Sequence, residues 1–163
     1  LVACTLLPDS GQILYNDVSI HNSPELYLNK IGVVADWVNL PEYLSFDELI
    51  TWKMERVGHS SVQIKEKTNE LKSLFSFDER SQQLIGTYSS GMRKKTALSV
   101  AVCTNPEVLL LDEPFVALDV STQRILAHFI IDLKKSGKII LLASHDEEHE
   151  EELFDNVIDF PMN

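Results

Sequence analysis

The residues best suited to chemistry are two adjacent carboxylates, Asp112 and Glu113, which directly follow the apolar run VLLL. Such a run is typical of a buried strand in a parallel sheet, and these sheets bind ligands at the carboxyl ends of their strands. Adjacent buried acids repel and desolvate each other unless a cation or a protic group faces them. A magnesium ion held by Asp112 and a water polarised by Glu113 would meet that need. One open alternative is that one acid caps the next turn and the other is a solvated strand end.

Two further segments contribute candidate residues. The apolar run KIILLAS ends at His145, which we therefore expect at the same edge of the sheet. The segment YSSGM, which contains Ser89, Ser90 and Gly91, precedes a predicted helix. Hydroxyl groups and an unshielded glycine N–H at a helix N-terminus form an anion site that suits a phosphate. The alternative is that one serine only caps the helix.

The elements that must position these residues follow from periodicity. The unbroken apolar runs at 108–112 and 138–144 predict parallel strands covered on both faces. Between them, residues 120–137 have the amphipathic pattern of a crossover helix, which indicates a right-handed βαβ unit. A further strand is predicted at 31–34, and the alternating segment 12–20 predicts a short one.

The middle of the chain has a helical pattern. Residues 45–74 show helical spacing, and Ser45 and Glu48 have the spacing of a capping box. We expect Trp52 to pack inside this helical part. A third helix is predicted over 89–106. The fold class is therefore α/β, with a parallel sheet interrupted by helices.

Composition limits the classes of function. The 163 residues suit one domain, and the net charge of −11 argues against a nucleic-acid partner, because duplex-binding surfaces are basic. The two cysteines lie in apolar segments and indicate a reducing, cytosolic compartment rather than a disulfide framework. No apolar run reaches the roughly 20 residues that a membrane-spanning helix needs.

Two other clusters have plain interpretations. The segment HDEEH at 145–149 suggests zinc, but His145 ends a strand and Asp146 occupies the position of the glutamate in H-E-x-x-H, so a zinc site is disfavoured. The basic residues 93–95 are interpreted as a surface stripe rather than a phosphate site.

Taken together, the segments YSSGM, VLLLDEP, ALD and ASHD resemble the nucleotide-binding domain of an ATP-binding-cassette (ABC) protein in order and spacing. They match its signature motif, Walker B motif, D-loop and switch histidine. PDSGQI and IGVV also match, so the resemblance covers nearly the whole chain. It implies an incomplete P-loop-NTPase-like sheet, with an α/β core at 1–40 and 105–163 and an inserted helical subdomain at 41–104.

The resemblance implies roles for residues at matching positions. Asp112 would bind Mg²⁺, Glu113 would be the general base, and His145 would contact the γ-phosphate of ATP and orient the water. Asp36 stands where the family has its Q-loop glutamine, and its carboxylate could still reach the magnesium ion.

The resemblance also implies partners. Ser89, Ser90 and Gly91 would bind ATP held by a second nucleotide-binding domain in a head-to-tail dimer, and Asp119 would signal across the interface. A separate transmembrane permease subunit would be the other partner, which places the protein in the cytoplasm, peripheral on the inner face of the cell membrane. Ser90 replaces the more common glycine, and the Y-S-x-G-M form resembles bacterial exporters.

One family motif is missing: no segment matches G-x-x-x-x-G-K-[ST], the loop that cradles phosphates. We therefore expect the chain to be an internal piece of a longer domain. Three functions remain open: an ATPase subunit of an ABC transporter, a soluble ABC ATPase acting on ribosomes or DNA, and a truncated remnant without nucleotide affinity of its own.

Overall fold

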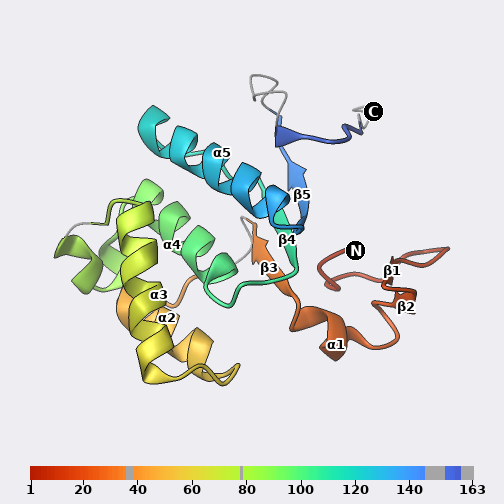
Figure 1. Cartoon of the computed structure of the whole chain (residues 1–163), viewed down its shortest axis with the longest axis horizontal. Helices are drawn as coiled ribbons and strands as arrows, with labels where there is room; N and C mark the ends of the chain where they lie inside the picture. The colour runs from red at the N-terminus through yellow and green to blue at the C-terminus, as the bar shows by residue number, and fades with distance from the viewer. Residues whose placement is uncertain (36–38, 78, 146–152, 159–163) are drawn as a thin grey trace.

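The centre of the molecule is a parallel sheet in which the strands follow the order β3-β4-β5 (Figure 1). The computed structural model describes residues 1–35, 39–77, 79–145 and 153–158. The strands are β3 (Ile31–Val34), β4 (Val108–Asp112) and β5 (Ile139–Ala143). In the register, Val34 pairs with Leu111, and Asp112 pairs with Ala143. The carboxyl ends of all three strands therefore meet at one edge, and the predicted α/β class is confirmed.

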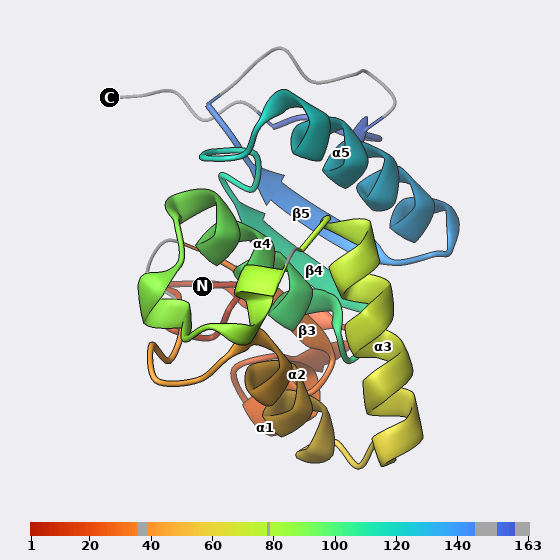
Figure 2. The ribbon, with the colours of Figure 1, turned by 90° about the vertical axis from the view of Figure 1, so that its left-hand side faces the viewer.

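The connection from β4 to β5 is the helix α5 (Val120–Lys135), as the sequence predicts. Figure 2 shows α5 lying alongside β5. Leu126 and Ile130 are almost fully buried in the main core, which also contains Leu111 of β4. The helix stops before Gly137, whose φ of 84° is the left-handed conformation favoured after helix ends.

Three longer helices lie between β3 and β4 in sequence: α2 (Phe46–Glu55), α3 (Ser61–Leu74) and α4 (Ser90–Val102). The predicted capping box at the start of α2 is confirmed, because the Ser45 side chain accepts from the Glu48 N–H and the Glu48 carboxylate accepts from the Ser45 N–H. Among the helices of the described residues, none is both long enough and apolar enough to cross a membrane.

Helix α4 packs directly on β3 because Gly32 allows their backbones to approach. A Cβ atom added to Gly32 would lie 2.0 Å from the Ala101 carbonyl oxygen and 2.9 Å from Leu109 Cδ1. No side chain fits in that space. Glycine inside a strand often marks such a close approach of another backbone.

The amino-terminal segment differs from its prediction. Instead of one strand over 12–20, it forms a hairpin of β1 (Leu14–Tyr15) and β2 (Val18–Ser19), followed by α1 (Pro24–Leu28). Asn16 and Asp17 have φ angles of 48° and 62°, and these two residue types tolerate the left-handed conformation that a two-residue hairpin turn needs. The alternating pattern that predicted a single strand therefore runs across this turn.

Two burial predictions are wrong. The Trp52 side chain is 52% exposed, with the Arg56 guanidinium 5.2 Å from its ring centre, whereas Met54 turns into the core. In β5, Ile139 and Leu141 are 49% and 44% exposed, so this strand is not covered on both faces. Within the described residues β5 is an edge strand, and only its other face packs against the core beneath α5.

Candidate active site

Glu113 adopts an unusual backbone conformation at the end of β4. Its φ is 44°, and its N–H donates to the carbonyl oxygen of Ala143 at 2.9 Å. The next residue, Pro114, is fully buried. A left-handed conformation costs a residue other than glycine about 1–3 kcal/mol, and a following proline further restricts the backbone. The surroundings of Glu113 must therefore hold it in place.

The Glu113 carboxylate contacts the end of the neighbouring strand. Oε1 accepts the backbone N–H of His145 at 2.8 Å, and the Ser144 hydroxyl donates to Oε2 at 3.4 Å. The His145 Nε2 atom lies 3.8 Å from Oε1. The His145 side chain is 87% exposed and that of Glu113 is 22% exposed, so the imidazole is open to a ligand. The structure thus brings together two of the side chains that the strand-end argument selected.

Asp112 lies beside this pair as the exposed last residue of β4. Mg²⁺ is usually bound by one or two carboxylates, with substrate phosphates and water completing its octahedron. The described residues contain no cluster of three or more His, Cys, Asp or Glu side chains that could hold a metal ion. An exposed carboxylate at this edge fits a magnesium site completed by a nucleotide. Asp36, the other predicted ligand, lies outside the described residues.

The segment at the start of α4 shows both a cap and an exposed surface. Ser89 is the N-cap, and its hydroxyl oxygen accepts the N–H of Met92 at 3.3 Å, which leaves its proton available for another acceptor. Ser90 is exposed as the first residue of the helix. A Cβ atom on Gly91 would lie 3.0 Å from the carbonyl oxygen of Ala117, so this helix start lies against the chain that follows Glu113.

Asp119 is the N-cap of α5, a role that the sequence analysis did not identify. Its carboxylate accepts the N–H of Thr122 at 2.9 Å and the Thr122 hydroxyl at 2.8 Å, and Ser121 donates a further hydrogen bond. The Ser121 and Thr122 bonds hold the pKa of the Asp119 carboxyl well below its usual range. The sequence signal for this cap is the segment D-V-S-T, in which an aspartate directly precedes an amphipathic run.

Arg93 and Lys94, two residues of the predicted surface stripe, make hydrogen bonds to other segments. The Arg93 guanidinium donates to Glu42 Oε1 at 2.9 Å and to the Gly86 carbonyl oxygen at 3.1 Å. The Lys94 Nζ donates to the carbonyl oxygen of Glu113 at 3.0 Å. Both side chains are half-buried. Residues 93 and 94 thus lie partly at the surface, as predicted, but their side chains are held by partners on other segments.

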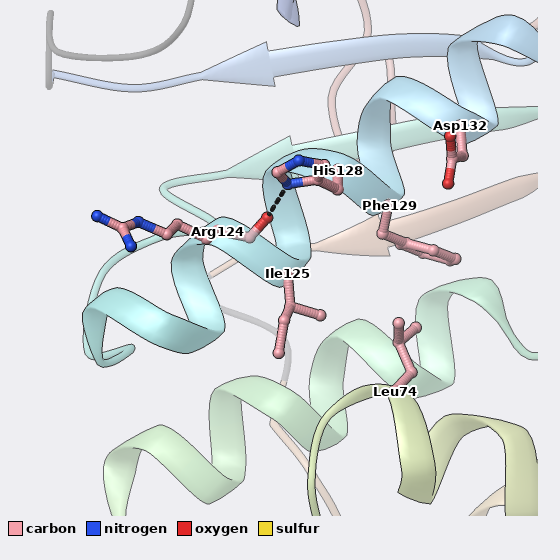
Figure 3. A pocket seen from close by; sticks show the side chains of 6 residues that line it. All are labelled: Leu74, Arg124, Ile125, His128, Phe129 and Asp132. Atoms are coloured by element: carbon pink, nitrogen blue, oxygen red, sulfur yellow. Dashed lines mark hydrogen bonds between the residues drawn. The ribbon is translucent and has the colours of Figure 1, made fainter.

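A separate pocket of about 370 Å³ lies between α5 and the end of α3 (Figure 3). Leu74, Ile125 and Phe129 give it an apolar lining, and its remaining lining residues are Arg124, His128 and Asp132. The His128 ring contacts the Arg124 carbonyl oxygen through Nδ1 at 2.8 Å. None of the candidate residues at the strand ends lines this pocket.

Comparison with known proteins gives consistent matches. A family model described as ABC transporter matches residues 1–116. The ABC transporter ATP-binding protein NatA of Bacillus subtilis is 29% identical over 97% of this chain and 65% of its own length. The sulfate/thiosulfate import ATP-binding protein CysA of a Synechocystis species is 30% identical over 93% of this chain and 42% of its own length.

A solved structure agrees with the fold. The dimeric, post-hydrolysis structure of the ATP-binding cassette MJ0796, bound to ADP and Pi, matches with a TM-score of 0.76 at 23% identity over 88% of this chain and 66% of that one. At this identity the match shows the fold, that of a P-loop NTPase. The chain spans between 42% and 66% of these relatives' lengths. Because the family model matches more than half of the residues, the chain belongs to the ABC transporter family.

Proposed function

We propose that this chain is part of the nucleotide-binding domain of an ATP-hydrolysing ABC transporter subunit. In this proposal, 1–40 and 105–163 belong to the α/β core and 41–104 form the helical subdomain that carries the signature motif. The observation that carries the proposal is the Glu113 carboxylate, held at the carboxyl edge of the sheet beside His145 and one residue past Asp112.

In the proposed mechanism, each of these residues has a separate role in ATP hydrolysis. Asp112 would hold Mg²⁺, with Asp36 as a second oxygen ligand, and the bound ion would supply positive charge beside the phosphates of ATP. Glu113 accepts a proton from the attacking water, and its fixed position supports this role because a general base needs hydrogen-bond reach to the proton that it removes. The exposed imidazole of His145 contacts the γ-phosphate and orients the water.

A second nucleotide-binding domain completes the proposed site. Ser89, Ser90 and Gly91 bind the γ-phosphate of ATP held by the opposite protomer, and the exposed N-terminus of α4 supports this role. Asp119 follows the same turn and signals across the interface. The cassette MJ0796 is dimeric in its solved structure, which supports a dimer of such domains.

The proposed membrane partner is a separate permease subunit, which ATP-driven dimerisation would drive. The support is family membership and the likeness to NatA and CysA, both named as ATP-binding proteins of transport systems. The protein would then lie in the cytoplasm, peripheral on the inner face of the cell membrane. The sequence features do not favour a ribosome-bound or DNA-bound ATPase, because the chain is strongly acidic.

The test is the variant Glu113→Gln in the full-length gene product. Glutamine keeps the shape of the side chain but cannot accept the water proton, so we expect the variant to bind ATP and accumulate as an ATP-bound dimer. Size-exclusion chromatography with Mg-ATP measures the dimer. Glu66→Gln, at an exposed position of α3, is the matched control and should remain in the wild-type distribution. A Glu113→Gln protein that forms no more dimer than the control would refute the assignment.

A further inference from the structure

Lys94 of α4 holds the backbone of Glu113, although the proposed chemistry assigns it no role. Its Nζ atom donates to the Glu113 carbonyl oxygen at 3.0 Å. The two residues belong to different elements, since Lys94 lies in the second turn of α4 and Glu113 follows β4. A hydrogen bond from a charged amine is about twice as strong as one between neutral groups.

Glu113 needs such a contact because its conformation is unfavourable without support. Three groups of this residue are held: its N–H by Ala143, its carboxylate by the N–H of His145, and its carbonyl oxygen by Lys94 at 3.0 Å and by the more distant N–H of Val116 at 3.3 Å. The first two partners come from β5 and the residues after it. Lys94 is the partner from the helical side. Rotating Glu113 toward the extended conformation that Pro114 favours would turn its carbonyl group away from the Lys94 amine.

The same helix touches this turn at a second point. Gly91, one turn before Lys94, lies close to the carbonyl oxygen of Ala117. The first two turns of α4 therefore lie against this turn at Glu113 and at Ala117. A displacement of the α4 N-terminus would reach the Glu113 backbone through these two contacts.

We infer that Lys94 is a positioning residue that keeps Glu113 in its left-handed conformation and so aims the carboxylate at the reacting water. This inference rests on the proposed function, in which Glu113 is the general base. Lys94 touches neither the nucleotide nor the water in this account. It links the serine-glycine segment of a protomer to the base of the same protomer.

The experiment measures steady-state ATP hydrolysis by the full-length gene product and its variants. Lys94→Met keeps an apolar stem but removes the donor, and should lower kcat by roughly 10-fold to 100-fold with KM changed less than about twofold, because small displacements of a catalytic group are costly. Lys94→Arg keeps a charged donor and should recover most of the rate. Lys65→Met, at an exposed position of α3, is the control and should behave as wild type.

A double-variant comparison separates positioning from a general loss of structure. In a Glu113→Gln background, Lys94→Met should cause no further fall in the residual rate, because there is no base left to position. A similar further fall in that background, or an unchanged kcat in the single variant, would overturn the inference while leaving the proposed function intact. Undiminished hydrolysis by Glu113→Gln would overturn both. Lys94→Leu, which also removes the donor, replaces the methionine variant if that protein does not fold, with the same expected loss.

Discussion

Replacing Gly32 by alanine should separate α4 from the sheet. The added Cβ atom would lie 2.0 Å from the Ala101 carbonyl oxygen, whereas close C···O contacts are about 3.3 Å, so one backbone must move by about 1.3 Å. Both the strand and the helix are packed in the core, and overpacking of this kind costs about 1–3 kcal/mol or more. We expect Gly32→Ala to lower the free energy of unfolding by about 3 kcal/mol, measured by urea denaturation.

The control for this variant is Gly86→Ala. Its added Cβ atom would lie 3.2 Å from the Glu42 carbonyl oxygen, so a shift of a few tenths of an ångström suffices. The loss of stability should be under about 1 kcal/mol, as for most surface substitutions. Because α4 also carries Lys94, Gly32→Ala should disturb Glu113 as well. Equal stability of the two alanine variants would refute the argument that close packing of α4 on β3 requires glycine.

Two further predictions concern titrating groups. Burial raises the pKa of the Cys103 thiol to about 11, so about one Cys103 thiol in a thousand is ionised at pH 8. A thiol reagent should therefore modify the half-buried Cys4 before Cys103. Mass spectrometry of the folded protein measures the two rates, and equal rates would contradict this prediction. The hydrogen bonds from Ser121 and Thr122 lower the pKa of Asp119 in the folded protein. The ionised carboxylate therefore stabilises the fold above the unfolded-state pKa of about 3.9, and this contribution is lost as the pH falls toward the folded-state pKa. Asp119→Asn, which keeps a capping oxygen without this titration, should therefore lose less thermal stability than wild type between about pH 5 and pH 2; parallel losses in the two proteins would argue against it.

The sequence allowed the sheet and its edge to be predicted because their signals are local. The apolar runs of β3 and β4, the crossover length of α5 and the capping box at Ser45 depend on neighbouring residues only. The meeting of Glu113 with His145 followed from one further rule, that the carboxyl ends of parallel strands share an edge.

The errors arose where packing between distant segments decides the outcome. Whether Trp52 faces the core depends on where α3 and α4 lie, and its own helical spacing does not settle this. The exposure of β5 depends on what covers each of its faces. The contact from Lys94 to the Glu113 carbonyl joins residues on different elements, and no short-range pattern indicates it. Gly32 was a missed signal, since glycine within an apolar strand suggests close backbone packing.

In the proposed mechanism, Glu113, held beside His145 at the carboxyl edge of the sheet, removes the proton from the water that cleaves ATP. Single-turnover hydrolysis of pre-bound Mg-ATP by the full-length gene product isolates this step from binding and product release. We expect Glu113→Gln to slow the single turnover by roughly 10²-fold to 10⁴-fold, the usual contribution of a general base. A single-turnover rate equal to that of the wild-type protein would contradict it.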